Sequence, residues 1–488
     1  MRLLKILSLL FLSNAALANN IEAHFATIKS NPKALYAFFK AMPKGGELHY
    51  HLAGGAYPEA MLALATKNDY CLNLKTQAIS KNIPCEGIKT TELANKPELH
   101  TDIIRAWSLK GFIPKLQSNH DHFFESFFKF IPIVSDFPSQ LLAKVIERAA
   151  NQHELYLEIM LMPDNGNSTT FDTLASSSND YAEKQRILLA NKNFQKNLHY
   201  TVIESHAILQ KTWQELGCDQ NPKKDVCSVT VKFQYYILRE QSLDKVFAQA
   251  LNAFAAASIS KDIVGVNLVQ AEDGAISLRD YQQQMQIFKF LHEAYPNVNI
   301  ALHAGELATP LVSATELRSH IHDAIFTGHA QRIGHGIDIT HETGAGELLK
   351  YMAKTPIPVE INLTSNRKLL NIAGKQHPLN DYLEYNVPVV LSTDDEGILR
   401  TNLTHEYVNA VMKHHLDYAA IKMINRNALT YSFLPGKSLW ADASKHEPVL
   451  ECQHLSSPSC QQFTNNNKKA SLQWQLEKKL ALFESTFE

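Results

Sequence analysis

The sequence predicts a (β/α)₈ barrel, and two observations support this fold class. Eight short apolar segments recur along the chain, and several are nearly continuous in apolar residues, such as "IVGVNLV", "NVNIALH" and "NVPVVLS". Strands buried on both faces have this composition and belong to parallel sheets. Stretches with a 3.6-residue apolar period, such as "SLDKVFAQALNAFAAAS", lie between most of them. An eightfold alternation of strand and helix is typical of a barrel.

The predicted strands cover residues 46–52, 155–162, 229–238, 263–269, 298–303, 332–337, 358–363 and 387–392. An open doubly wound sheet is the alternative. It would lead us to expect a glycine-rich phosphate loop after the first strand, and no G-x-G-x-x-G motif is found there.

The start of the chain reads as an export signal over residues 1–18. A basic start precedes an apolar run at 6–12, and "ALA" at 16–18 fits a cleavage site. We therefore expect a periplasmic or secreted protein without a membrane span. The net charge of −2 gives no electrostatic reason for binding nucleic acid, so a small molecule is the expected partner, with a homodimer as one expected assembly.

Three further regions surround or interrupt the barrel. We expect a helical segment at 19–41, a barrel domain at 42–440 with an insertion at about 68–110, and a C-terminal extension at 441–488 that ends in a helix. About a hundred residues separate the first two strands, more than one helix and its loops require. The polar stretch 163–180 follows the second strand, so it is either a lid over the active-site face or a plain surface loop.

Six cysteines fall into local pairs, Cys71 with Cys85, Cys218 with Cys227 and Cys452 with Cys460. An even number in an exported chain suggests disulfides, and proximity favours these pairs among about fifteen possible pairings. A cysteine-based zinc site is disfavoured because no Cys-x-x-Cys occurs.

Histidines and carboxylates mark the ends of four predicted strands. His49 and His51 lie two apart in "ELHYHLAGG", so their side chains point to the same side of a strand. The other ends carry His303 with Glu306 in "LHAGE", His335 in "RIGHG", and Asp394 with Asp395 in "LSTDD". The carboxyl ends of barrel strands meet at one mouth, where catalysis occurs. The pair His120 and His122 in "NHDHFF" has no leading apolar strand, and we interpret it as a solvated helix start.

These residues predict a zinc site. His49, His51, His303 and Asp394 form a nitrogen-rich ligand set that suits one Zn²⁺ per chain, and zinc lowers the pKa of a bound water toward ~7. Glu306 can deliver a proton, His335 can orient or deprotonate the water, and Asp395 can anchor substrate. This chemistry alone allows cleavage of a C–N bond, an amide or an ester.

The motifs "MPKGGELHYHL", "LHAGE", "RIGHG" and "LSTDD", in this order, resemble those of the adenosine deaminase family of zinc amidohydrolases. "EINLTSN" also resembles a segment of that family, and the likeness spans about residues 42–434. The export signal, the cysteine-bearing insertion and "NLVQAEDG" look most like the secreted, growth-factor-related branch.

The resemblance implies hydrolytic deamination of adenosine to inosine and ammonia. It implies the same four zinc ligands, Glu306 as donor of a proton to the purine ring, His335 as the residue positioning hydroxide, and Asp395 as a hydrogen-bond partner of the ring. Two positions depart from the family. Ala53 replaces an acidic residue that contacts the sugar, and Gln270 replaces a glycine next to the ring. A related 6-aminopurine nucleoside or a pterin-like amine is therefore also compatible.

Two other functions are compatible with the motifs. A cyclic amide or ester hydrolase on this scaffold often uses two metals bridged by a modified lysine, and "IVGVNLVQAED" has no lysine. A non-catalytic, secreted nucleoside-binding protein would tolerate loss of Glu306, which is present.

Overall fold

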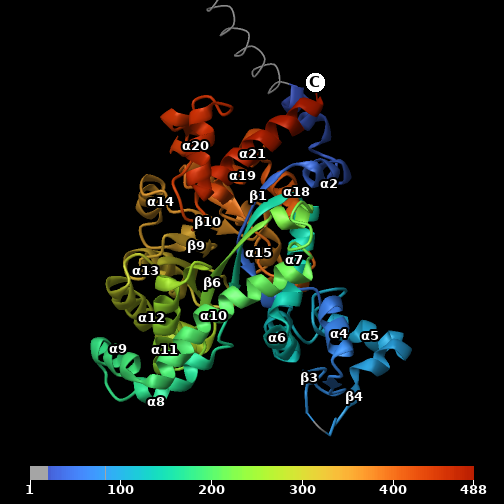
Figure 1. The fold of residues 1–488 in the computed structure, drawn as a ribbon, viewed down its shortest axis with the longest axis vertical. Helices are drawn as coiled ribbons and strands as arrows, with labels where there is room; N and C mark the ends of the chain where they lie inside the picture. Colours follow the sequence, from blue (N-terminus) through green and yellow to red (C-terminus); the bar gives the residue numbers. More distant parts are fainter. Residues whose placement is uncertain (1–19, 83, 488) are drawn as a thin grey trace, which may run out of the picture.

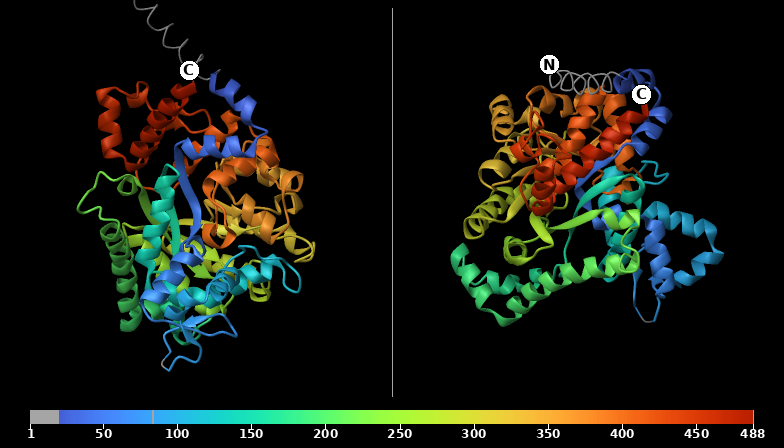
Figure 2. Two further views of the ribbon diagram at one scale, coloured as in Figure 1. Left: turned by 90° about the vertical axis from the view of Figure 1, so that its right-hand side faces the viewer. Right: turned by 45° about the horizontal axis from the view of Figure 1, so that its top comes forward.

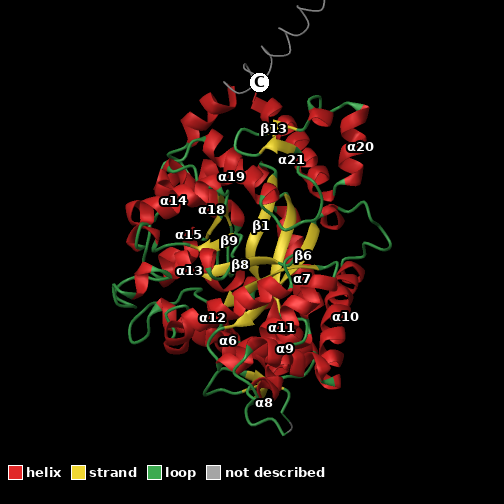
Figure 3. Cartoon of the chain, turned by 90° about the vertical axis from the view of Figure 1, so that its left-hand side faces the viewer, coloured by secondary structure: helices red, strands yellow, loops and turns green. Residues whose placement is uncertain are grey.

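The computed structural model describes residues 20–82 and 84–487. Eight parallel strands form one sheet in chain order, enclosed by helices (Figures 1 and 3). The sheet closes where the His51 N–H donates to the Asp394 carbonyl (3.0 Å) and the Asp394 N–H donates to the His49 carbonyl (3.2 Å). The strands are β1 (Lys44–His51), β5 (Glu154–Leu161), β6 (Thr230–Leu238), β7 (Ile263–Val269), β8 (Asn299–Ala304), β9 (Arg332–His335), β10 (Val359–Ile361) and β11 (Val389–Leu391). The predicted (β/α)₈ barrel and all eight predicted strand segments are confirmed.

Helices pack around the sheet because each buries an apolar face on it. In α11 (Leu243–Ile259) the run from Val246 to Ala256 is wholly buried between the sheet and its neighbours. The other helices that follow strands are α7 (Pro138–Asn151), α10 (Lys192–Glu215), α12 (Ala275–Ala294), α13 (His320–Phe326), α14 (Ala345–Lys354), α15 (Leu363–Leu369), α16 (Leu379–Glu384), α17 (Glu396–Leu399), α18 (Leu403–His414) and α19 (Tyr418–Thr430).

The chain between β1 and β5 forms a lobe beside the barrel mouth, drawn in blue at the lower right of Figure 1. A small antiparallel sheet has the order β3-β2-β4 and is tied by the Cys71–Cys85 disulfide. The elements of this region are α3 (Leu52–Gly55), α4 (Pro58–Lys67), β2 (Cys71–Leu72), β3 (Ile79–Ser80), β4 (Ile88–Lys89), η1 (Thr90–Asn95), α5 (Pro97–Ala106) and α6 (Asn119–Asp136).

The histidines of α6 are not a solvated helix start. His122 is 5% exposed, and its Nε2 lies 2.9 Å from the Arg105 carbonyl oxygen. His120 Nε2 lies 3.2 Å from a carboxylate oxygen of Asp273, in the loop after β7. The interpretation as a helix start is correct and the expected solvation is wrong, because tertiary contacts cover both rings.

The polar stretch 163–180 is folded rather than open. It contains the 3₁₀ helix η2 (Asn167–Phe171) and the short helix α8 (Asp172–Ala175), which pack on α11, and α9 (Tyr181–Ala190) follows. The buried Asp164 carboxylate accepts hydrogen bonds from Ser168 N (2.9 Å) and Tyr235 OH (2.5 Å). This anchor holds the stretch on the barrel wall.

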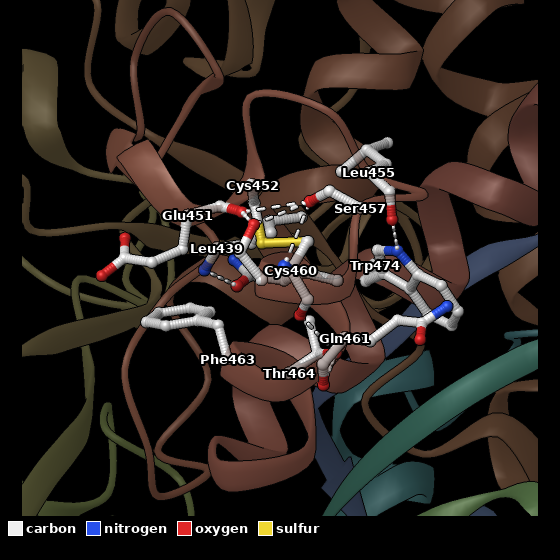
Figure 4. The surroundings of a disulfide bond; sticks show 12 residues. Leu439, Glu451, Cys452, Leu455, Ser457, Cys460, Gln461, Phe463, Thr464 and Trp474 are labelled. Atoms are coloured by element: carbon white, nitrogen blue, oxygen red, sulfur yellow. Dashed lines mark hydrogen bonds between the residues drawn. A yellow bond between two sulfur atoms is a disulfide. The ribbon is translucent and has the colours of Figure 1, made fainter.

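The C-terminal region has a small core of its own. The disulfide Cys452–Cys460 lies at its centre, and the Trp474 indole donates to the Leu455 carbonyl at 2.7 Å (Figure 4). Its elements are β12 (Trp440–Asp442), β13 (Glu447–Pro448), η7 (Leu450–Cys452), α20 (Pro458–Asn466), α21 (Lys468–Glu484) and η8 (Ser485–Phe487). The third disulfide joins Cys218 to Cys227, which lies in the 3₁₀ helix η3 (Asp225–Ser228). The three predicted cysteine pairings are therefore confirmed.

The two ends of the described chain lie side by side (Figure 2). Residues 20–28 are helical and α2 (Pro32–Ala41) follows. Phe38 of α2 packs edge-on against Phe483 of α21, with ring centroids 5.1 Å apart. The predicted export signal at 1–18 lies outside the described residues and stays a prediction. Within the described part, none of the helices combines the length and apolar character that a membrane span needs.

Candidate metal centre and active-site pocket

Four of the predicted site residues meet at the mouth of the barrel. His49 and His51 end β1, His303 ends β8, and Asp394 follows β11. His51 Nε2 lies 3.2 Å from His303 Nε2, and Asp394 Oδ1 lies 3.3 Å from the Nε2 atoms of both His49 and His51. Ligands of a tetrahedral zinc with bonds of about 2.0 Å are separated by about 3.3 Å. These three distances fit donors around a common divalent ion. Among the described residues, ligand atoms of His49, His303, His335 and Asp394 also lie within 4.8 Å of one another, so by distance alone either His51 or His335 can complete the set.

Buried partners fix the orientation of the donor atoms. His49 Nδ1 donates to Glu360 Oε2 (2.8 Å), and His303 Nδ1 donates to Asn267 Oδ1 (2.9 Å). Each contact places the ring proton on Nδ1 and leaves the Nε2 lone pair facing the centre, as in metal-binding histidines. Within the described chain, the buried His49 Nε2 has no hydrogen-bond partner. A group of this kind that stays unsatisfied is costly unless something binds it.

The charge states also suit a cation. Burial and the neighbouring His49 lower the pKa of His303 well below its usual range, which keeps its ring neutral. Burial opposes ionisation of Asp394, but contacts from His49 and His51 hold the pKa of this carboxyl well below its usual range. Neutral imidazoles and an ionised carboxylate are the forms that bind metal. Burial opposes protonation of His49, but its contacts with Asp394 and Glu360 raise its pKa to about 9, so this ring would release a proton when a metal binds. His303 and Asp394 already have the required charge states, and the donor types suit zinc.

Glu306 and His335 lie beside the donors. Glu306 follows Gly305, and its backbone N–H donates to the buried Glu272 carboxylate at 2.7 Å. Burial and the nearby Asp394 carboxylate raise the pKa of Glu306 well above its usual range. His335 Nδ1 lies 3.5 Å from Glu306 Oε1, and burial lowers the pKa of His335 to about 3. The pair thus consists of a protonated acid and a neutral imidazole.

Asp395 lies on the same face of the mouth. Burial and the adjacent Asp394 charge raise its pKa well above the usual range, and Oδ1 is buried without a hydrogen-bond partner among the described residues. A Cβ on Gly54 would come within 1.6 Å of this oxygen, so the position must be glycine. The glycine at the end of "HLAGG" therefore leaves the space that the Asp395 carboxylate occupies.

The two positions that depart from the expected pattern both line the pocket. Gln270 has φ of +85°, a backbone conformation that favours glycine. Its Oε1 accepts the Glu240 backbone N–H at 2.9 Å, which holds the side chain against the neighbouring loop. Ala53 is 5% exposed and borders the cavity with a single methyl group.

A cavity of about 440 Å³ opens above these groups, a volume that suits a nucleoside-sized ligand. Its floor is polar and includes Glu306 and Asp395, whereas its opposite wall is apolar. The wall comes from α6 and consists of Phe123, Phe124, Phe127, Phe128 and Ile131. The cavity is therefore covered by α6, and the stretch 163–180, predicted as a lid or a plain surface loop, does not line it.

Sequence reasoning assigned no role to the residues that support the donors. Glu360, Ser365 and Asn366 all lie in "EINLTSN", and Asn267 and Glu272 lie in "NLVQAEDG". Ser365 Oγ donates to Asp394 Oδ2 at 2.8 Å. These segments were marked by resemblance only, since the spacing of polar residues in one strand does not show which neighbour they contact.

Comparisons with known proteins identify the family of this chain. The family model described as "Adenosine deaminase" matches residues 191–441, about half of the chain. An adenosine deaminase of Klebsiella pneumoniae (strain 342) is 35% identical over 137 residues, 28% of this chain and 38% of that protein. One from Pseudoalteromonas translucida is 31% identical over 192 residues, 39% of this chain and 52% of that protein. The chain thus spans between a third and about half of the length of these relatives.

Solved structures share the fold. An adenine deaminase from Arthrobacter aurescens has a TM-score of 0.55 at 18% identity, covering 90% of this chain and 99% of that one. An amidohydrolase from Burkholderia ambifaria with bound Zn has a TM-score of 0.51 at 15% identity, covering 93% and 94%. The residues that match the family model include β8, β9 and β11. The two histidines of β1 lie outside the matched residues, but the barrel places β1 in the same sheet as these strands. This protein belongs to the adenosine deaminase family.

Proposed function

We propose that this protein is a zinc-dependent aminohydrolase that converts a 6-aminopurine nucleoside to its 6-oxo product and ammonia. The observation that carries the proposal is the group of four donors at zinc-like spacing beside a protonated Glu306. Family membership and the bound Zn of a protein with the same fold support it.

His49, His51, His303 and Asp394 would hold the ion, one per chain. A zinc ion, when bound, lowers the pKa of water and so supplies a nucleophile at neutral pH. His335 Nδ1 accepts an N–H from Asn366 (3.0 Å), so its proton sits on Nε2, which makes His335 a hydrogen-bond donor rather than a ligand. This tautomer favours His51 over His335 as the third histidine of the metal site.

Glu306 supplies the acid. Its raised pKa keeps a proton on the carboxyl at neutral pH, where it can pass to the ring nitrogen beside the reacting carbon. Protonation of that nitrogen would let the carbon accept an electron pair from water, with one water proton passing to the Glu306 carboxylate. The remaining hydroxyl proton would leave with the amino group as ammonia, which gives the 6-oxo product. Asp395, also held protonated and without a partner, can donate to a second ring nitrogen and fix the plane of the base.

The test is ammonia release together with the fall in ultraviolet absorbance as a 6-aminopurine becomes a 6-oxopurine. Zinc-loaded protein is expected to turn over at least one nucleoside from a panel of aminopurines. Release of no ammonia from any member would contradict the proposal and favour the nucleoside-binding alternative. Hydrolysis of cyclic amides or esters instead would support the other scaffold chemistry.

A further inference from the structure

The active-site cavity continues beyond the reacting groups. A second cavity of about 260 Å³ lies beside it, and the two meet at the shared residues Ala53, Ile131, Met162 and Tyr236. We propose, building on the proposed deamination, that the second cavity holds an apolar substituent on the sugar of the substrate. The preferred substrates are then 6-aminopurine nucleosides with an alkyl or alkylthio group at the 5′ carbon, the sugar atom that extends farthest from the base.

The junction between the cavities is mainly apolar. Three of its four residues are Ala53, Ile131 and Met162, and Ala53 contributes only a methyl group. A nucleoside hydroxyl placed there would give up its hydrogen bonds to water, and Tyr236 is the one shared residue whose side chain could replace them. An apolar group at the same place gains free energy from burial. Beyond the junction Leu52, Val134 and Ile208 continue the apolar surface, while Ser139 and Gln140 bring polar groups to the lining.

The charges argue against a phosphate in the same position. Of the described residues that line the catalytic cavity, none is lysine or arginine, while Glu240, Glu306 and Asp395 bring carboxyl groups. The second cavity has one lysine, Lys211, which is exposed and accompanied by the acidic Glu204. A buried phosphate would lack the paired cations that it needs. The substrate is therefore a nucleoside and not a nucleotide.

A homologous series of substrates tests this proposal. The kcat/KM of zinc-loaded protein is measured for adenosine, 5′-deoxyadenosine, adenosine 5′-monophosphate, and 5′-methylthio and 5′-butylthio derivatives. We expect a rise of about fourfold for each methylene that becomes buried, and a value for the monophosphate at least tenfold below that of adenosine. Equal or faster turnover of adenosine relative to every 5′-substituted compound would overturn the proposal while leaving the deaminase function intact. Turnover of none of them would overturn the deaminase function itself.

Variants of α7 locate the effect. Gln140 lines only the second cavity, so Gln140→Trp should fill it and abolish the rise in kcat/KM with chain length. Lys144 lies on the same helix, its side chain is 54% exposed, and it lines neither cavity. Lys144→Trp is therefore the matched control, and kcat/KM should still rise with chain length in this variant. A chain-length dependence that survives Gln140→Trp would place the substituent elsewhere and contradict the proposal.

A separate observation carries a second proposal, about His377. This histidine is 2% exposed and precedes α16. The Leu379 N–H donates to His377 Nδ1 (3.1 Å), so the His377 proton must sit on Nε2, from which it donates to Asn366 Oδ1 (3.2 Å). The Asn366 amide nitrogen then faces His335 Nδ1. We infer that His377 is a positioning residue, because a chain of three hydrogen bonds that starts at the Leu379 N–H fixes the tautomer of His335.

His377→Leu tests this role. Without the donor, the Asn366 amide can rotate and His335 can take the other tautomer, so we expect kcat to fall at least tenfold with KM and zinc content unchanged. His377→Gln retains an N–H donor and should restore most of kcat. His414→Leu is the matched control, because His414 is a buried neighbour with its ring 5.3 Å from that of His377. Equal losses in the two leucine variants, or no rescue by glutamine, would overturn the inference.

Discussion

Among the clusters of buried polar groups within the barrel, two neighbouring ones differ in how well they are satisfied. In the lower cluster Arg332 donates to Glu360 Oε1 (2.6 Å) and to Glu158 Oε2 (2.6 Å), and its guanidinium also stacks on Phe433. In the upper cluster, His49 Nε2 and the Nε2 of His335 are buried without hydrogen-bond partners in the described chain. Glu360 joins the two clusters, since its Oε1 contacts Arg332 and its Oε2 contacts His49.

This difference separates structure from function. Protein partners satisfy the polar atoms of Arg332, Glu158 and Glu360 in the lower cluster, so it can be explained by folding alone. The upper cluster would be destabilising as it stands, because buried polar atoms without partners cost free energy. A site that keeps such atoms is arranged for something that the chain does not itself supply. The four predictions below run from the largest expected effect to the smallest. The first three test this contrast, and the fourth tests a region outside both clusters.

Removal of the metal should abolish activity. Dialysis against a chelator takes away the group that the upper cluster is arranged to hold, so ammonia release from the best nucleoside substrate should fall below detection. Addition of one equivalent of Zn²⁺ should restore it. Full activity in protein shown by metal analysis to be free of zinc would contradict the assignment.

Glu306→Gln should lower kcat by about 10²–10⁴-fold, because a positioned acid typically contributes that much. The substitution keeps the shape of the side chain but removes the transferable proton. Bound zinc should stay at the wild-type level, since Glu306 is not among the four donors. A variant that remained near the wild-type rate would show that another group protonates the substrate.

Arg332→Met should lower the free energy of unfolding by about 3–5 kcal/mol, because it leaves Glu158 and Glu360 buried without their cation. Lys232→Met is the control. Lys232 pairs with Asp262 at 3.1 Å but is 20% exposed, so its loss should cost at most about 1 kcal/mol. Urea unfolding measures both, and equal effects would mean that the lower cluster adds no more than a surface pair.

Replacement of Cys452 and Cys460 by alanine should have the smallest effect. The disulfide closes a short loop, with a sequence separation of 8, so its loss should cost about 2–3 kcal/mol by loop-closure entropy. The C-terminal region has its own small core, and the barrel mouth lies outside it. We expect unchanged kcat/KM and faster proteolysis of this region. A loss of activity would instead couple the C-terminal region to the site.

The sequence was sufficient for the barrel and for its polar strand ends. Continuous apolar runs indicate strands that are buried on both faces. The carboxyl ends of such strands lie at one face of the barrel, regardless of the length of the segments between them. His303 and Asp394 could therefore be placed together although 91 positions separate them in the numbering.

Contacts between distant segments could not be predicted in the same way. The aromatic residues of α6 fit the apolar face of any surface helix, and only the fold shows that Phe123 and Phe127 cover the pocket. The stretch 163–180 is held in place because Asp164 accepts hydrogen bonds from its own loop and from Tyr235, and no local pattern reveals these contacts. His377 acts at a distance of two hydrogen bonds, a relation that exists only in three dimensions.

The most direct test of the metal centre is anomalous X-ray scattering at the zinc edge from crystals of the purified protein. We expect a single peak per chain at about 2.0–2.2 Å from the Nε2 atoms of His49, His51 and His303 and from Oδ1 of Asp394. Two peaks, a peak bound to His335 in place of His51, or a peak away from the barrel mouth would contradict the account.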